Sequence, residues 1–165
     1  MIKIVKESVV FQDTDAIVNA ANSDLLEGGG VCGAIFRNAG GDLQEECDSL
    51  HGCKTGDAKI TKGYKLKAKY IIHAVGPVYS HSKEDKRLLS NCYRRCMDLV
   101  KENNLKSISF CCISTGIYGY PLYDASKIAV DTVKEWLVEN DYEVEVRFCC
   151  FKDIEYETYK KIMEE

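Results

Sequence analysis

The sequence predicts an α/β protein in which strands alternate with helices. Two observations predict this fold class. Short apolar segments of strand length recur along the chain, and longer segments with helical spacing of apolar residues separate them. This alternation indicates a sheet built from β-α-β units and covered on both faces. Because 165 residues is the length of one ordinary domain, we expect a single domain over residues 1–165.

Five short segments rich in apolar residues are predicted to be strands. They are residues 2–5, 16–19, 70–75, 107–113 and 144–149. Runs interrupted by Gly63 and Gly76 suggest edge or mixed strands in addition. Residues 61–70 are rich in lysine, but the lysines alternate with apolar residues, which predicts a solvated strand face rather than a binding patch.

Helical periodicity is clearest in residues 87–102 and 125–139. In the second segment, one face carries apolar residues at three- and four-residue spacing, namely Ile128, Val130, Val133, Trp136 and Leu137. A further helix is expected to begin near Val31, after a run of glycines. A last helix follows Asp153, which we expect to be its N-cap.

Charge and hydropathy exclude several classes of function. The formal net charge of -4 leaves no excess of positive charge for general nucleic-acid binding, which rests on neutralisation of phosphates by Lys and Arg. No window approaches the roughly 20 apolar residues of a membrane span. The N-terminal segment is interrupted by charge too often for a signal peptide. We therefore expect a cytoplasmic protein that binds neither membranes nor nucleic acids in general.

The nine cysteines suit a reducing compartment, because an odd number inside apolar segments indicates buried thiols rather than a disulfide framework. Cys111 and Cys112, like Cys149 and Cys150, are adjacent in strand-like segments, where neighbours point to opposite faces and do not chelate one ion together. His73 lies in an apolar strand, which favours a structural histidine. We expect no metal ion and no cofactor.

Two loops that leave strands are the candidate ligand site, because ligands of α/β sheets bind beyond the carboxyl ends of strands. We call residues 19–33 the first loop and residues 114–121 the second loop. They contain Gly28, Gly29 and Gly30, and Ser114, Thr115 and Gly116, respectively. Glycines bring backbone N–H groups close to a ligand, and a helix N-terminus adds partial positive charge, so an anion is held without a cation. Facing loops would clamp both halves of a pyrophosphate, with two hydroxyl groups as further donors.

A rival interpretation comes from the spacing of Gly28, Gly30 and Gly33, which matches the G-x-G-x-x-G pattern of dinucleotide-binding turns. That turn follows its strand immediately, whereas here a longer segment intervenes. A Walker-type phosphate loop is excluded because the chain has no Gly-Lys-Ser/Thr in this segment. Of the two asparagines in the first loop, Asn19 is interpreted as structural. Asn22 is expected to face the ligand, since its amide suits sugar hydroxyls.

Five motifs, in this order and spacing, resemble those of macrodomains close to the MacroD-type bacterial proteins. They are DAIVNAANSDLLEGGGVCGAI, CKTGDAKIT, IIHAVGP, ISTGIYGYP and FCCF. The resemblance covers essentially the whole chain. It implies a three-layer α/β/α sandwich on a mixed, roughly six-stranded sheet, with ADP-ribose or its esters in a cleft along the strand ends. Mono-ADP-ribosylated proteins are the implied macromolecular partners.

The resemblance also implies roles for individual residues. Phe151 matches the aromatic residue that packs on adenine, Asn22 touches the distal ribose, and the diphosphate lies between residues 28–31 and 114–118. The residues implied at the reacting ribose are Asn22, Gly29, Gly30 and Tyr118. The implied ligand contacts are Ser8, Ile17, Asn22, Gly28, Gly29, Gly30, Val31, Cys32, Ser114, Thr115, Gly116, Ile117, Tyr118 and Phe151.

Three positions depart from the family pattern. Ser8 stands where an aspartate usually accepts a hydrogen bond from the adenine amino group, which puts adenine selectivity in question. Cys32 stands where MacroD-type hydrolases have aspartate, and Phe36 where they often have histidine. The usual water-activating carboxylate is therefore missing, and a thiol is a poor base for water. We expect Cys32 to have a packing role.

Two functions of different classes share every binding residue. The favoured function is hydrolysis of ADP-ribosyl esters, either on mono-ADP-ribosylated protein or in O-acetyl-ADP-ribose, with a substrate phosphate oxygen positioning the water. The alternative is a reader module that binds ADP-ribose without turning it over. Only the group that activates water distinguishes them.

Overall fold

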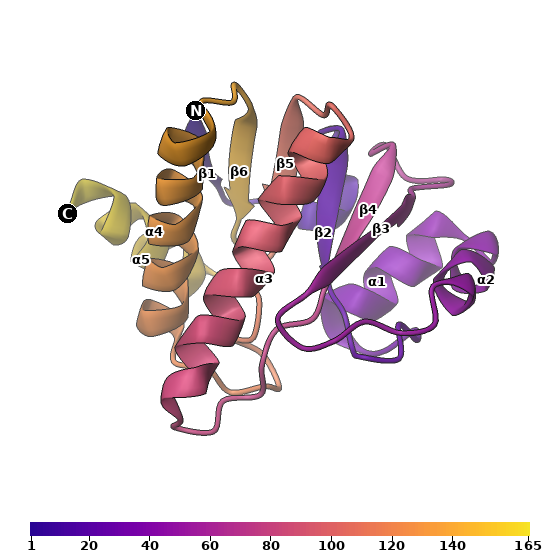
Figure 1. Cartoon of the computed structure of the whole chain (residues 1–165), viewed down its shortest axis with the longest axis horizontal. Coiled ribbons are helices and arrows are strands. Elements are labelled where there is room, and N and C mark those ends of the chain that lie inside the picture. The colour runs from indigo at the N-terminus through magenta and orange to yellow at the C-terminus, as the bar shows by residue number, and fades with distance from the viewer.

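The computed structural model describes residues 1–165 and contains one mixed six-stranded sheet (Figure 1). The strand order is β1-β6-β5-β2-β4-β3. All neighbouring strands are parallel except β3 and β4, which are antiparallel. The strands are β1 (Ile2–Val5), β2 (Ala16–Ala20), β3 (Ala58–Lys62), β4 (Tyr70–Ala74), β5 (Ser107–Phe110) and β6 (Glu145–Cys149).

Helices cover both faces of the sheet, so the predicted three-layer α/β/α fold is confirmed. In Figure 1, α3 (Lys83–Glu102) and α4 (Leu122–Asn140) cross the near face, and α1 (Gly30–Ala39) lies on the far face. Helix α5 (Asp153–Glu164) packs against α4 and β1, and α2 (Asp42–Ser49) packs against α1 and β3.

Aromatic rings fill the space between the sheet and the layer formed by α3, α4 and α5. The rings of Phe110 in β5 and Phe148 in β6 stack with centroids 5.5 Å apart. Phe148 in turn stacks on Tyr159 of α5 at 5.1 Å, and Tyr93 of α3 lies 5.2 Å from Phe110. This contact chain joins two strands to two helices, and burial of its large rings stabilises the layer. No helix combines the length and the apolar character needed to cross a membrane.

Several predicted boundaries were wrong. Residues 61–70 do not form one strand face, because β3 ends at Lys62 and the N–H of Gly63 donates to the Lys69 carbonyl (2.8 Å), which closes a turn into β4. Strand β5 ends at Phe110 rather than at residue 113. The N-cap of α5 is Lys152, and Asp153 is the first helical residue. Helix α2 was not predicted, because only Leu43 and Cys47 of this polar segment are buried.

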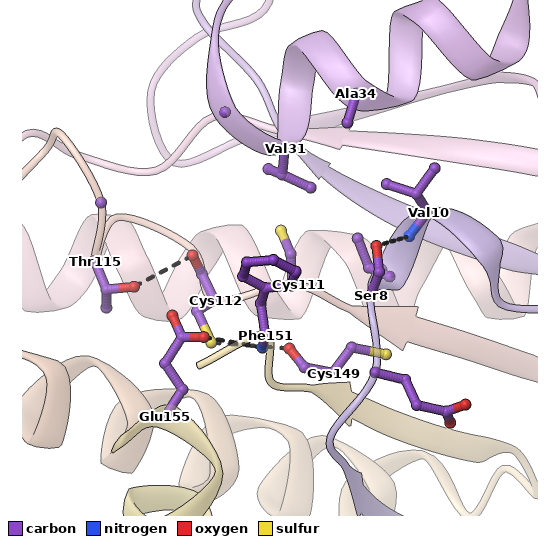
Figure 2. Close-up of a pocket in the computed structure, with 14 residues that line it drawn as sticks. Ser8, Val10, Val31, Ala34, Cys111, Cys112, Thr115, Cys149, Phe151 and Glu155 are labelled. Carbon is purple, nitrogen blue, oxygen red and sulfur yellow. Dashed lines mark hydrogen bonds between the residues drawn. The ribbon is translucent and has the colours of Figure 1, made fainter. Parts of the chain in front are cut away.

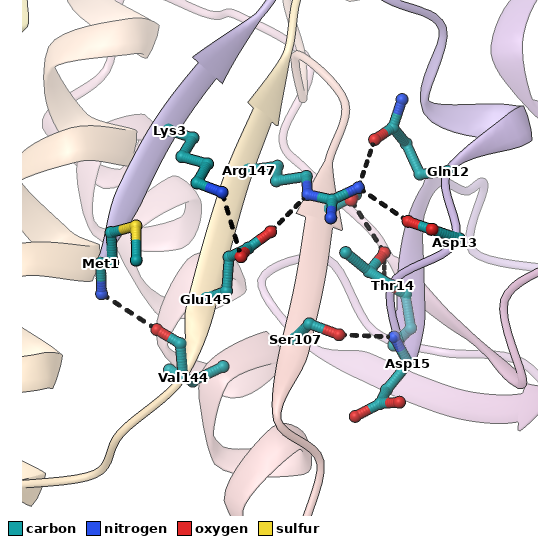
Figure 3. A network of polar contacts seen from close by, with 12 residues as sticks. Met1, Lys3, Gln12, Asp13, Thr14, Asp15, Ser107, Val144, Glu145 and Arg147 are labelled. Atoms are coloured by element: carbon teal, nitrogen blue, oxygen red, sulfur yellow. Dashed lines mark hydrogen bonds and ion pairs between the residues drawn. The ribbon is translucent and has the colours of Figure 1, made fainter.

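A polar network near the amino ends of the parallel strands holds the segment that enters β2 (Figure 3). The guanidinium of Arg147 in β6 donates to Glu145 (2.6 Å), Gln12 (2.9 Å) and Asp13 (3.0 Å). The hydroxyls of Thr14 and Ser109 lie 2.8 Å apart. Partly exposed ion pairs of this kind add little stability. Their effect here is to fix the course of the chain between the 3₁₀ helix η1 (Val9–Phe11) and β2.

Candidate functional site

Two adjoining cavities open at the carboxyl ends of the parallel strands. Cavity A has a volume of about 420 Å³, and cavity B of about 350 Å³. Gly30 and Val31 of the first loop, Gly116 of the second loop and Cys112 line both cavities. The two loops predicted from the sequence therefore meet at the junction of the cavities, and together the cavities form one continuous cleft.

Cavity A is an apolar chamber with an aromatic ring at its edge (Figure 2). The ring belongs to Phe151, which is 78% exposed. Ser8 lines the cavity from the side of η1, where its Oγ accepts a hydrogen bond from the N–H of Val10 (3.2 Å). The charged side chains in the lining are those of Glu7 and Glu155, and no lysine or arginine is among them. A flat apolar ligand fits such a chamber, with the exposed ring as a stacking surface.

Cavity B contains neither a carboxylate nor a histidine in its lining. Asn22 and Cys32 line it from the first loop and α1, and Ile117 and Tyr118 line it from the second loop. The Ile117 side chain is fully exposed, at 100%. The cavity therefore offers an amide, a thiol and backbone donors, but no ordinary general base.

The first loop presents unpaired backbone donors to the junction. The N–H groups of residues 28–32 donate to no acceptor within the chain, and α1 begins at Gly30 with its positive end at this point. Side chains at Gly29 or Gly30 would meet nothing within 4 Å, so both positions face open space. At Gly33, by contrast, a Cβ would lie 2.4 Å from the carbonyl oxygen of Gly28, so α1 packs directly on the loop. This arrangement suits an anion.

The second loop presents a similar row of donors, but not the hydroxyls that the sequence suggested. The N–H groups of residues 114–118 also donate to no acceptor within the chain. The Ser114 hydroxyl instead donates to the Pro77 carbonyl (2.8 Å), and the Thr115 hydroxyl donates to the Cys112 carbonyl (3.4 Å). Correcting that expectation, both hydroxyls hold the loop in shape, because buried polar groups pair with nearby carbonyls.

The two asparagines of the first loop differ as expected. Asn19 is fully buried in β2, and its Nδ2 lies 3.1 Å from Nδ1 of His73. Asn22 lines cavity B, and its amide closes the loop by donating to the Leu26 carbonyl (2.8 Å) and accepting from the Leu26 N–H (3.0 Å). One amide hydrogen of Asn22 remains for a ligand, and the loop fixes its direction.

Cys32 occupies the first turn of α1 with 6% of its surface exposed. Its Sγ donates to the Leu26 carbonyl (3.6 Å) and accepts from the Asn19 amide (3.6 Å). Phe36, one turn further along α1, packs beside His73 with ring centroids 6.4 Å apart and lines neither cavity. The thiol is thus engaged with its neighbours and has no acidic or histidine partner in the cleft.

One expected contact is not brought to the cleft, and several lining residues were missed. Ile17 is fully buried within the central strand β2, covered on both faces, and lines neither cavity. The missed residues include Cys112, at the junction, and Glu155, in the first turn of α5. The position of Cys112 just after a parallel strand was a signal for a cleft residue. Glu155 had no such signal, because its approach depends on how α5 packs.

Three cysteines near the cleft, Cys111, Cys112 and Cys149, are held as thiols. Burial raises the pKa of Cys111 and of Cys149 to about 12. The hydrogen bond with Cys150, together with burial, raises the pKa of Cys112 far above its ordinary value. Protonated thiols are poor nucleophiles and poor metal ligands. No group of three or more His, Cys, Asp or Glu side chains is placed to hold a metal ion.

Fold and cleft together define an α/β protein with two facing loops of unpaired backbone N–H groups at the carboxyl edge of its sheet. A model of the Macro domain family matches residues 18–129. The chain belongs to the macrodomain family, and the resemblance read from its motifs is confirmed.

Two relatives support this assignment. Human ADP-ribose glycohydrolase MACROD2 is 51% identical over 99% of this chain, which spans only 39% of the human protein. Macro domain-containing protein CT2219 of Chlorobaculum tepidum is 48% identical over 99% of this chain and 95% of that protein.

Solved structures agree closely with the fold. The Oceanobacillus iheyensis macrodomain with ADP has a TM-score of 0.94 and 40% identity, covering 98% of this chain and 88% of that one. The Trypanosoma brucei macrodomain in complex with ADP-ribose has a TM-score of 0.94 and 45% identity, covering 98% of this chain and 68% of that one.

Proposed function

We propose that this protein binds ADP-ribose along the cleft and hydrolyses ADP-ribosyl esters. The observation that carries the proposal is the pair of facing rows of unpaired N–H groups, residues 28–32 and 114–118, at the junction of two cavities. A diphosphate between the rows would receive several hydrogen bonds without any cation. The Trypanosoma relative in complex with ADP-ribose supports this choice of ligand.

The shapes of the cavities orient the ligand. Adenine would lie in cavity A against the ring of Phe151, and the distal ribose would lie in cavity B beside Asn22. The remaining Nδ2 hydrogen of Asn22 would donate to a hydroxyl of that ribose, with Gly29, Gly30 and Tyr118 around it. The reverse orientation would leave the aromatic ring against a sugar and the amide against a base edge.

The hydrolytic step would use a water molecule positioned by the substrate. Since no carboxylate or histidine lines cavity B, and the Cys32 thiol donates to the Leu26 carbonyl, the chain supplies no ordinary base there. A phosphate oxygen of the bound ligand would accept a hydrogen bond from water and direct it to the ester. Water adds, the ester bond to the ribose breaks, and the acid and ADP-ribose leave. The 51% identity to a protein named as an ADP-ribose glycohydrolase supports this activity.

A reader module is the second candidate function, and the lining of cavity B favours it. Positioned general bases contribute on the order of a hundredfold or more to hydrolysis, and the cavity has none. A reader needs only the donors, the aromatic ring and the Asn22 amide, all of which are present.

The two functions are separated by incubating the protein with O-acetyl-ADP-ribose and with Glu-linked mono-ADP-ribosylated protein, and by following release with mass spectrometry. Release above the rate of the buffer, lost in Asn22→Ala, supports a hydrolase. If the protein binds ADP-ribose but releases no product from either substrate, the reader function is assigned. The absence of ADP-ribose binding rejects both.

A further inference from the structure

Glu155 occupies an unusual place, because it caps a helix and lines a cavity at once. Its Oε1 accepts hydrogen bonds from the N–H groups of Phe151 (3.0 Å) and Lys152 (2.8 Å). The bond from the N–H of Lys152, the N-cap residue, is the carboxylate half of a capping box at the start of α5, and both bonds hold the turn that carries the Phe151 ring. The side chain is half-buried, and it lines cavity A. The position of its carboxyl group is therefore set by the backbone of the turn.

The second oxygen of this carboxyl group is not used by the protein. Both capping bonds end on Oε1, and Glu155 takes part in no ion pair. In Figure 2 the carboxyl group lies between Thr115 and Phe151 at the edge of the cavity. It also contributes to the raised pKa of Cys112, after the hydrogen bond with Cys150 and burial, which places its charge near the junction of the cavities.

The inference rests on the proposed function, which would place a sugar in the space between Phe151 and the second loop. With the base against Phe151 and the diphosphate at Gly30 and Gly116, the ribose that joins them must bridge the space between the ring and the loop. Glu155 and Thr115 bound that space. The Thr115 hydroxyl already donates to the Cys112 carbonyl, so the free carboxyl oxygen of Glu155 is the strong acceptor available to the sugar.

The charge around cavity A also favours a sugar with free hydroxyls over a phosphorylated sugar. Its lining holds two carboxylates, Glu7 and Glu155, and no lysine or arginine. A sugar with two free hydroxyls can donate to such a surface. A phosphate group on the same sugar would place added negative charge beside a fixed carboxylate, with no cation in the lining to compensate.

We propose that Glu155 is a specificity-determining residue that accepts hydrogen bonds from the hydroxyls of the adenosine ribose and rejects ligands phosphorylated there. The preferred ligand class is ADP-ribose and its esters with a free 2′-hydroxyl. The rejected class is ADP-ribose 2′-phosphate and its esters, which differ by one phosphate group at the site of contact.

Calorimetric titration of the whole protein with ADP-ribose and with ADP-ribose 2′-phosphate tests the proposal. Glu155→Gln is the informative variant, because its amide oxygen can still cap α5 while the negative charge is lost. Glu157→Gln is the matched control, since Glu157 is an exposed acid on the same helix that lines neither cavity. The melting temperatures of both variants are compared with that of the parent, and equal values show that the cap of α5 is retained.

The parent protein should bind ADP-ribose at least about tenfold more tightly than the 2′-phosphate, the size expected from a hydrogen bond to a charged group. In Glu155→Gln this preference should fall by about fivefold or more, and in Glu157→Gln it should not change. The ratio of the parent's affinities for ADP-ribose and its 2′-phosphate should also fall as the salt concentration is raised, because screening weakens repulsion between charges.

Failure of the inference and failure of the proposed function give different results. If the parent does not bind ADP-ribose at all, the proposed function is wrong. If the parent binds both ligands equally, or if Glu155→Gln keeps the parent's preference while retaining its melting temperature, the role of Glu155 is overturned and the ADP-ribose site stands.

If Glu155→Gln melts at a lower temperature than the parent, Glu155→Asp provides the second test. It keeps the charge but shortens the reach, so it should retain rejection of the phosphate while binding ADP-ribose more weakly. Acceptance of the 2′-phosphate by that variant overturns the inference.

Discussion

The side-chain amide of Asn19 in β2 donates a hydrogen bond to Nδ1 of His73 in β4 (3.1 Å), with both side chains fully buried. On the other side of the ring, Nε2 lies 2.8 Å from the Thr61 hydroxyl in β3. Because an amide nitrogen can only donate, Nδ1 accepts and the imidazole is neutral. Burial lowers the pKa of His73 to about 4. Three strands are thus joined by one buried polar chain behind the cleft.

The buried contacts of His73 with Asn19 and Thr61 predict that the protein loses stability in mild acid. Protonation of His73 is easier in the unfolded chain, with a pKa near 6.5, than in the folded protein, with a pKa of about 4. The stabilisation is therefore complete above pH 6.5 and is lost as the pH falls toward 4, by about 3 kcal/mol in total. Urea unfolding between pH 7 and 4.5 measures it. A His73→Gln variant should show a weaker dependence than the parent, and equal slopes would show that other groups control the acid response.

Binding should require the whole diphosphate ligand. We expect ADP-ribose to bind far more tightly than AMP or ribose phosphate, because each of two linked phosphates would receive hydrogen bonds from one row of unpaired N–H groups. Calorimetry compares the three ligands. Salt should weaken binding only modestly, since neither loop contains a lysine or an arginine and short hydrogen bonds dominate. Equal affinity for AMP would contradict the diphosphate site.

The ring of Phe151 should contribute to affinity without contributing to stability. Phe151→Ala is expected to lose about 1 to 3 kcal/mol of ADP-ribose binding, the range for stacking of an aromatic side chain on a base. Melting should change little, because the ring is 78% exposed. Ile154→Ala is the control, since Ile154 is an exposed apolar residue on the same turn that lines neither cavity. An unchanged affinity in Phe151→Ala would place the base elsewhere.

Ser8 should set the selectivity for the base. Ser8→Asp is expected to increase the preference for ADP-ribose over its hypoxanthine analogue, because a carboxylate accepts a hydrogen bond from the amino group of adenine more strongly than a hydroxyl does. The fold should persist, since aspartate can replace serine as the N-cap of η1, where Ser8 Oγ accepts from Val10. Competition binding measures the ratio. An unchanged ratio would indicate that Glu7, in the same cavity, already takes this role.

Cys32 and Asn22 should respond differently to truncation. Cys32→Ala is expected to keep turnover of one ester-linked substrate within a few-fold, because the thiol packs and donates to the Leu26 carbonyl rather than activating water. Asn22→Ala should remove most turnover, because it loses both hydrogen bonds to Leu26 and the donor to the ribose. Loss of activity in Cys32→Ala, together with inactivation of the parent by iodoacetamide, would require a thiolate mechanism instead.

The same site permits a gain-of-function variant. Cys32→Asp should raise turnover, since a positioned general base contributes on the order of a hundredfold or more. Phosphates of the substrate would raise the pKa of the new carboxyl group, which makes it a better base near neutrality. Phe36 offers it no histidine partner, which limits the gain. Turnover is compared only among proteins that still bind ADP-ribose. If neither the parent nor any such variant turns over the substrate, the reader function is assigned.

Much of the architecture was determined by local sequence. The alternation of apolar strands with amphipathic helices such as α4 predicts a covered sheet, because burial of one face needs that periodicity wherever the segment is placed. The run of three glycines at the start of α1 predicts an anion loop, because residues without side chains let a ligand approach the unpaired N–H groups of a helix start closely. Family motifs then specified the ligand that these loops are expected to bind.

The tertiary structure alone decided how side chains far apart in the sequence share one cleft. The Ser114 hydroxyl turns away from the cleft because the Pro77 carbonyl, brought beside it where the segment after β4 packs on the second loop, accepts its hydrogen bond. Ile17 is withdrawn from the cleft because β2 is central, with partners on both sides. Glu155 reaches cavity A because α5 returns beside β1, and no local pattern records that return. Contacts of this kind depend on distances between segments, which residue spacing along the chain does not contain.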